Sequence, residues 1–237
     1  MGVVFVTGAS RGIGHELVRQ CAARGDQVVA AARTERSVEA LGREFGDNVL
    51  PMRCDVSDDA SITEARRQLE GRIERIDLLV NSAGLYSLHA DHWDPSRTMF
   101  DTISRAELNT VFDVNATGAM LVIKAMLGLL RRSERPRILN LSSLMGSVSA
   151  RTSPGDYAYA ASKAALNIMT RSFAAEFRDE GIIAVAMTPG WVRTDMGGAN
   201  AALSPDEAVR TMLATADGLT IQESGAFIDY AGEPQPW

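Results

Sequence analysis

The sequence predicts an α/β fold, a doubly wound parallel sheet forming a single domain over residues 1–237. Short apolar runs alternate with helical patterns along the whole chain, which is the order of strands and crossover helices in such a sheet. The apolar runs are continuous rather than alternating, as expected where helices cover both faces of the sheet. No repeat, low-complexity tract or Pro/Gly-rich linker divides the 237 residues. These observations together favour a Rossmann-type architecture.

Seven apolar runs are expected to form strands, and six helical patterns connect them. The strands are predicted at 2–7, 27–32, 48–52, 76–81, 137–141, 182–188 and 226–230. The helices are predicted at 13–24, 35–44, 59–71, 104–131, 158–179 and 205–215. Open α/β sheets bind ligands beyond the carboxyl ends of their strands. Candidate functional residues are therefore sought just after each apolar run.

Composition excludes several classes of function. The net charge of −6 argues against binding nucleic acid through a basic surface. Cys21 and Cys54 form no CxxC or zinc-ligand spacing, which predicts a reducing compartment without a disulfide framework. The apolar stretch 116–130 is interrupted by Lys124, and the first residues lack a signal peptide's charged region. We expect a cytoplasmic protein that does not enter a membrane.

A glycine-rich turn follows the first apolar run and opens into a helical pattern. Such a turn lets the backbone approach a pyrophosphate, and the N-terminus of the helix presents free N–H groups to the anion. An ordinary strand–helix connection is the alternative, but the position after the first strand favours a nucleotide site. The expected cofactor contacts in this turn are Gly8, Ser10, Arg11, Gly12, Ile13 and Gly14.

The end of the second apolar run indicates which dinucleotide binds. An NAD enzyme usually carries an acid there to hold the ribose 2′-hydroxyl, whereas this chain has Ala32 followed by Arg33. Arg33 and Arg11 could hold a 2′-phosphate through their guanidinium groups. NADP(H) is therefore favoured over NAD(H). Two surface arginines are the alternative interpretation, and Glu35 is a nearby acid that complicates the assignment.

A tyrosine and a lysine four residues apart begin the fifth helical pattern. The spacing of Tyr159 and Lys163 places both side chains on one helix face. A free tyrosine has a pKa of about 10, and a neighbouring ammonium favours the phenolate. The pair can therefore serve as a general acid and base near neutral pH. A solvated helix face is the alternative interpretation of this pair taken alone. Tyr157 lacks a lysine at the same spacing.

A set of motifs follows the predicted elements in a fixed order along nearly the whole chain. These motifs are 7–14, 81–84, Asn115, 142–143, Tyr159 with Lys163, and 189–190. Together they resemble the short-chain dehydrogenase/reductase family. Within that family, Gly146 with Ser147, the segment 191–198 and the ending 227–237 resemble the C-factor/sniffer-like carbonyl reductases.

The resemblance implies a catalytic role for four residues. Ser143 would polarise the substrate carbonyl, with Ser142 as the competing candidate. Tyr159 would donate a proton to the carbonyl oxygen during reduction and take it back during oxidation. Lys163 would lower the pKa of Tyr159 and bind the nicotinamide ribose, and Asn115 would hold a water that connects Lys163 with solvent.

The resemblance also implies cofactor contacts outside the glycine-rich turn. Asp55 would bind the adenine amino group, although a turn or N-cap role fits it equally well. Asn81 would brace the central sheet beside the cofactor. The remaining cofactor contacts implied by the resemblance are Val56, Ala83, Gly84, Pro189, Gly190, Val192 and Thr194, together with Tyr159 and Lys163, and they add to Arg33 at the end of the second apolar run.

The substrate pocket is expected to be mainly apolar, under a short lid. The segment 191–204, the expected lid, is rich in glycine and alanine and offers few groups to bind a large polar substrate. Reduction of an aldehyde, ketone or quinone is therefore the expected reaction. The alternatives are a 3-oxoacyl or steroid-type dehydrogenase, and an NADP(H)-binding regulatory or signalling protein. The expected substrate contacts are Tyr86, Ser143, Met145, Tyr159 and Trp191.

Two further features bear on metals and partners. His89 and His92 form a short His-x-x-His in an expected loop, with no third ligand, so no metal site is predicted. In the family that the chain resembles, the helices corresponding to 104–131 and 158–179 form a dimer interface. We therefore expect a homodimer or homotetramer.

Overall fold

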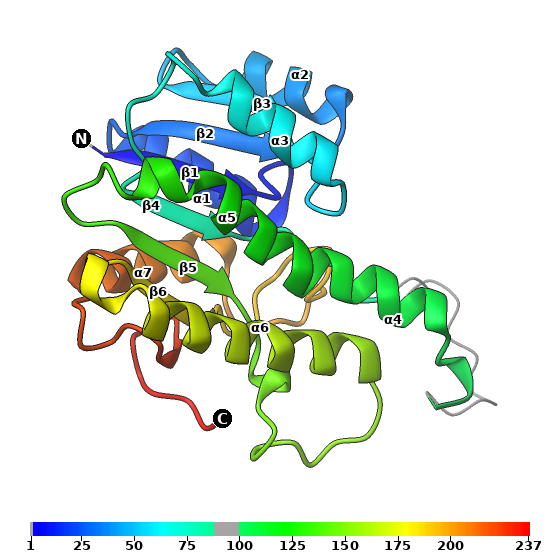
Figure 1. The fold of residues 1–237 in the computed structure, drawn as a ribbon. Coiled ribbons are helices and arrows are strands. Elements are labelled where there is room, and N and C mark those ends of the chain that lie inside the picture. Colours follow the sequence, from blue (N-terminus) through cyan, green and yellow to red (C-terminus); the bar gives the residue numbers. More distant parts are fainter. Residues whose placement is uncertain (1, 88–99) are drawn as a thin grey trace.

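The computed structural model describes residues 2–87 and 100–237, and Figure 1 shows their arrangement. Seven parallel strands form one sheet in the order β3-β2-β1-β4-β5-β6-β7. The strands are β1 (Val3–Thr7), β2 (Gln27–Ala32), β3 (Val49–Arg53), β4 (Leu78–Asn81), β5 (Arg137–Leu141), β6 (Ile183–Thr188) and β7 (Phe227–Asp229). This order confirms the predicted doubly wound sheet.

Helices cover both faces of the sheet. The α-helices are α1 (Gly12–Ala23), α2 (Glu35–Glu44), α3 (Asp59–Gln68), α4 (Arg105–Phe112), α5 (Gly118–Leu130), α6 (Tyr157–Glu176) and α7 (Pro205–Gly218). Shorter turns are the 3-10 helices η1 (Phe100–Thr102), η3 (Leu144–Gly146) and η4 (Arg178–Glu180), and the π-helical turn η2 (Asp113–Thr117).

The core lies in two layers, one on each side of the strands. Leu17 of α1, Leu41 of α2 and Met212 of α7 pack with one set of strand residues. Ile62 of α3 and Ile123 of α5 pack with the other set. In Figure 1 the layer of α3, α5 and α6 lies in front of the sheet. Since every inner strand has an apolar layer on each side, its continuous apolar sequence is explained.

Two helices differ from the prediction. The pattern at 104–131 is α4, η2 and α5 in succession, because one wide π turn interrupts the α-helical hydrogen bonding. A single inserted π turn barely disturbs a 3.6-residue apolar pattern, so the pattern could not reveal it. The helix predicted at 59–71 ends at Gln68, and Gly71 follows it with a φ of +73°.

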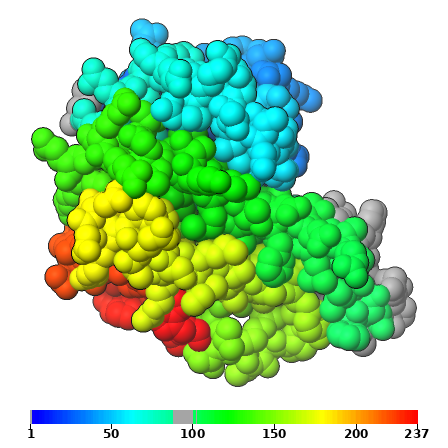
Figure 2. All heavy atoms as spheres, in the orientation of Figure 1, coloured from blue at the N-terminus to red at the C-terminus, as the bar shows by residue number. Residues whose placement is uncertain are grey.

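The run Arg105–Leu130 is long and apolar enough to cross a membrane by length and composition. Val122, Ile123 and Met126 of this run are buried against the sheet. Its apolar character is therefore accounted for by the core that it covers. Figure 2 shows α5 and α6 side by side on the front of the molecule.

Candidate active site

The carboxyl ends of β1 and β4 form the point where the strand order reverses. The Thr7 hydroxyl at the end of β1 accepts hydrogen bonds from the backbone N–H groups of Ser82 (3.0 Å) and Ala83 (3.1 Å). This contact fixes the segment after β4 against the glycine-rich turn after β1. Crevices at such a reversal are the usual ligand sites of open α/β sheets.

Two glycines of the glycine-rich turn lie where a side chain would not fit. Gly8 has a φ of +67°, and a Cβ there would lie 2.8 Å from the Ala83 Cα. A Cβ on Gly14 would lie 2.3 Å from the Gly8 carbonyl oxygen. The N-terminus of α1 has neither a side-chain cap nor an acidic residue in its first turn. Its amide groups are thus suited to bind a phosphate, and this supports a dinucleotide at the site.

The basic residues expected at a 2′-phosphate lie on the surface beside this turn. Ala32 ends β2 buried, and Arg33 follows exposed. The Arg11 guanidinium lies 3.0 Å from the Asp195 carboxylate, with both side chains about three-quarters exposed. Glu35 faces Arg53 at 3.8 Å. An ion pair as exposed as that of Arg11 is worth at most about 1 kcal/mol, so a bound phosphate could replace Asp195.

Asp55 stabilises the turn that follows β3, which is one of the roles that fit it in the sequence. Its carboxylate accepts hydrogen bonds from the backbone N–H (3.0 Å) and the hydroxyl (2.7 Å) of Ser57. Asp58, rather than Asp55, caps α3. Val56 is buried, and its carbonyl closely approaches Gly118 of α5.

Tyr159 and Lys163 lie buried on one face of α6, behind the end of β5. The Lys163 Nζ donates a hydrogen bond to the Leu141 carbonyl at 2.7 Å. It lies 5.6 Å from the centroid of the Tyr159 ring. Ser143 follows β5, and its side chain acts on the Tyr159 phenol in the direction that lowers the pKa of that phenol. The structure thus brings three of the four predicted catalytic side chains together.

The neighbouring serine has a different environment. The Ser142 hydroxyl is buried and donates to the Asn167 side chain at 2.6 Å. Ser143 is only half-buried, and its hydroxyl accepts a hydrogen bond from the Met145 backbone at 3.1 Å. Ser142 therefore has a structural partner, whereas Ser143 faces Tyr159.

Asn115 lies in the π turn η2 and is buried. Its side-chain amide donates to the Leu85 carbonyl (2.8 Å) and to the Ser162 hydroxyl (3.0 Å), while its oxygen accepts from the Leu85 N–H (2.8 Å). Ser162 in turn donates to the Tyr159 carbonyl at 2.7 Å. Asn115 therefore ties the segment after β4 to the catalytic helix. Sequence reasoning missed Ser162, whose position inside the Tyr-x-x-x-Lys motif is the signal that could have found it.

Burial sets the charge states of the catalytic pair. It lowers the pKa of Lys163 to about 8. It also raises the pKa of Tyr159 to about 12, opposed by the hydrogen bond with Ser143 and reinforced by the negative charge of Asp156. The expected lowering of the tyrosine pKa by Lys163 is not seen in this structure. The reason is that removal of the phenol from water outweighs the other influences.

A buried polar chain braces the sheet behind the site. The Asn81 amide donates to the Asn140 side chain at 2.8 Å, and the Asn140 amide donates to the Thr170 hydroxyl at 2.8 Å. These contacts link β4, β5 and α6. Asn81 thus joins two central strands, and it precedes Ala83 and Gly84 at the crevice.

The segment after β6 crosses back over the glycine-rich turn. Gly190 has a φ of +77°, and a Cβ there would lie 2.8 Å from Leu203. Pro189 precedes this turn, and Val192 is buried and bridges to Leu203. The methyl group of Thr194 lies 3.3 Å from where a Gly12 Cβ would be. The predicted lid residues therefore lie next to the expected phosphate site.

On the side of Tyr159 expected to face the substrate, Tyr86 contacts the catalytic ring, with 5.0 Å between the ring centroids. The Tyr86 hydroxyl donates to the carboxylate of Asp156. Met145 lies half-buried in η3 beside Ser143. Trp191 is more exposed, and its indole N–H donates within the lid to the Gly197 carbonyl at 2.8 Å.

The His89/His92 pair lies outside the described residues. Within 2–87 and 100–237, no group of His, Cys, Asp or Glu is arranged to hold a metal ion.

Comparison with known proteins identifies the class to which this site belongs. The sequence model of the short chain dehydrogenase family matches residues 2–203, so the chain belongs to that family. It is 41% identical to the C-signal protein of Myxococcus xanthus over 162 residues, covering 68% of this chain and 93% of that protein.

Solved structures give the same class in more detail. The carbonyl reductase Sniffer of Drosophila melanogaster superposes with a TM-score of 0.89 at 26% identity, covering 100% of both chains. The NADPH-bound carbonyl reductase from chicken fatty liver superposes with a TM-score of 0.89 at 30% identity, covering 100% of this chain and 94% of that one. The chain is thus a short-chain oxidoreductase with carbonyl reductases among its structural neighbours.

Proposed function

We propose that the protein is an NADP(H)-dependent oxidoreductase that reduces the carbonyl of an aldehyde, ketone or quinone to an alcohol. The observation that carries this proposal is the buried Tyr159–Lys163 pair with Ser143 at the phenol. The pair lies beside a glycine-rich turn whose helix N-terminus is uncapped. Carbonyl reductases among the structural neighbours support the same reaction.

Each catalytic residue has a distinct task in the proposed reduction. The Ser143 hydroxyl donates a hydrogen bond to the carbonyl oxygen and polarises it, and Tyr159 gives that oxygen its proton. NADPH, when bound, supplies the hydride. Lys163 would hold the nicotinamide ribose hydroxyls of the bound cofactor and would favour release of the tyrosine proton. Asn115 would hold the water through which that proton is replaced from solvent.

The preference for NADP(H) rests on charge at the end of β2. Ala32 offers no carboxylate to a ribose 2′-hydroxyl, and a 2′-phosphate would meet Arg33 and Arg11 instead. Arg11 would exchange its exposed contact with Asp195 for the phosphate. The NADPH in the chicken carbonyl reductase supports this assignment.

The first test is NADPH and NADH oxidation at 340 nm with isatin and phenanthrenequinone as substrates. We expect turnover with NADPH to exceed that with NADH. Tyr159→Phe should lower kcat by at least about 100-fold, because the proton donor is lost, while NADPH binding measured by fluorescence persists. Tyr157→Phe is the matched control, since Tyr157 is 41% exposed and two residues away on α6. Its turnover should match that of the native protein.

A signalling role is the second candidate, because one relative at 41% identity is named C-signal. Absence of turnover across a broad carbonyl panel, with tight NADPH binding intact, would replace the reductase proposal with this one. A signalling assay with Tyr159→Phe separates the two roles further. A sensor that needs only the bound cofactor keeps its effect in that variant.

A further inference from the structure

Asp156, the residue before α6, has an unusual backbone conformation. Its φ of 51° and ψ of 35° lie in the left-handed region, and it is the only residue other than glycine with a positive φ in the described parts of the chain. Such a conformation costs energy and persists where the surroundings enforce it. Aspartate is a preferred helix cap, yet this side chain makes no capping hydrogen bond. Its carboxylate must therefore be held by other groups.

In the part of the chain that the structure describes, two groups hold the Asp156 carboxylate beside the catalytic tyrosine. The ring of Tyr86 packs against Tyr159, and its hydroxyl donates a hydrogen bond to one oxygen of the Asp156 carboxylate. Arg151 approaches the other oxygen at 3.8 Å. The Asp156 side chain is 17% exposed and that of Arg151 22%. A largely desolvated negative charge thus lies at the wall of the expected substrate pocket.

The other polar groups described around Tyr159 do not fully neutralise the negative charge of Asp156. Lys163 directs its ammonium to the Leu141 carbonyl, and Ser143 is neutral. Arg151 is shared, because its guanidinium also donates to the Gly155 carbonyl. The Asp156 charge raises the pKa of Tyr159, which indicates that the reacting phenol is within electrostatic reach of the carboxylate.

We propose that Asp156 is a specificity-determining residue that makes the site select neutral carbonyl substrates over those carrying a carboxylate near the carbonyl. This inference rests on the proposed reductase function. A substrate whose carbonyl meets Tyr159 and Ser143 would bring its own carboxylate close to that of Asp156. At the effective dielectric of a partly buried site, repulsion over several ångströms corresponds to roughly a tenfold or larger loss of kcat/KM.

The test compares two substrates that differ mainly in charge. They are 4-carboxybenzaldehyde and its neutral methyl ester, each reduced with NADPH, and the readout is the ratio of kcat/KM for the ester to that for the acid. We expect a ratio of roughly 10 or more in the native protein. Asp156→Asn keeps the oxygen that accepts from Tyr86 and loses the charge, so its ratio should fall toward 1. Arg151→Gln removes the compensating charge, so its ratio should rise.

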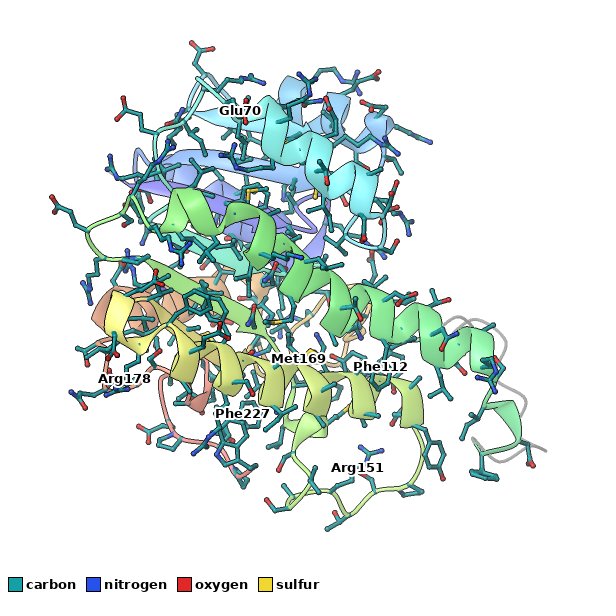
Figure 3. The ribbon with its side chains drawn as sticks, viewed as in Figure 1. Glu70, Phe112, Arg151, Met169, Arg178 and Phe227 are labelled. Atoms are coloured by element: carbon teal, nitrogen blue, oxygen red, sulfur yellow. The ribbon has the colours of Figure 1, made fainter. Side chains whose placement is uncertain are left out.

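Asp179→Asn is the matched control because it removes an exposed carboxylate in η4, beyond the opposite end of α6. Figure 3 shows the separation: Arg151 lies on the loop that leads into α6, and Arg178 lies beyond its far end. The 20 residues of α6 span about 30 Å. The ratio in this control should equal that of the native protein.

Several outcomes would overturn the inference. Equal kcat/KM for both substrates in the native protein refutes it while leaving the reductase function established. A ratio in Asp156→Asn that matches the Asp179→Asn control also refutes it. If Asp156→Asn fails to fold, Arg151→Gln decides, because an unchanged or lower ratio in that variant contradicts the assigned charge effect. Absence of turnover with the neutral ester and with every other carbonyl overturns the proposed function itself.

Discussion

Lys163 is a fully buried amine whose pKa is lowered from 10.5 to about 8. Between these two values the unfolded chain binds more protons than the folded chain, so stability rises with pH. Below pH 8 both states carry the charge, and the folded state bears the full penalty of burying it. The site therefore holds a group that changes charge slightly above neutral pH.

Lys163→Met should make this effect measurable. We expect the free energy of unfolding of the native protein, relative to that of the variant, to increase by about 3 kcal/mol from pH 8 to pH 10.5. It should be constant below pH 8. Urea unfolding at a series of pH values provides the measurement, and Lys124→Met removes an exposed amine as the control. A difference that stays flat across this range would contradict the burial effect.

The sequence placed most of the site residues but could not give their contacts. The family spacing to Gly146 favours Ser143 over Ser142, but only the structure gives the physical difference, which is that Ser142 is buried against Asn167. Asp156 was missed because an aspartate before a helix is typical of an ordinary N-cap. Its left-handed backbone, which directs the carboxylate to Tyr86, has no signature in the sequence.

At the scale of the element, two glycines of α5 differ in how closely other residues pack against them. A Cβ on Gly118 would lie 2.3 Å from the Val56 carbonyl oxygen, whereas one on Gly128 has no atom within 4 Å. Gly118 therefore lets the helix approach the segment beside the expected adenine site. Gly128 gains nothing from the missing side chain and weakens the helix.

Alanine substitutions at these two glycines should change stability in opposite directions. Gly128→Ala is expected to raise the free energy of unfolding by about 0.5–1 kcal/mol, through helix propensity. Gly118→Ala is expected to lower it by about 1–3 kcal/mol, because the helix or Val56 must move. Urea midpoints at equal slopes measure both changes. Stabilisation by Gly118→Ala would show that the close approach is not constrained.

The ends of a strand were predictable where helices cover both faces of the sheet at that strand. β2 and β5 begin and end at the predicted residues, because continuous apolar sequence with polar flanks defines a strand covered on both faces. The π turn at Asn115 was not predictable. It depends on hydrogen bonds to Leu85 and Ser162, which lie far from Asn115 in the sequence.

At the scale of the whole molecule, part of α6 has an apolar surface that the described residues, 2–87 and 100–237, leave uncovered. Ile168 is 60% exposed and Met169 is 38% exposed. Figure 3 labels Met169 on α6 at the front of the molecule. The sequence pattern identified the apolar helix but could not say whether the sheet or another chain covers each side. Such a surface on a long helix suits an interface with a second copy.

We expect light scattering after size-exclusion chromatography to give at least twice the 25.5 kDa mass of one chain. Ile168→Glu combined with Met169→Glu should shift the protein toward the monomer, because two charges would be buried in the interface. Gln222→Glu adds a charge at an exposed position between α7 and β7, and it should leave the mass unchanged. A native protein that elutes as a monomer at micromolar concentration would show that this surface of α6 is exposed to solvent in the functional form.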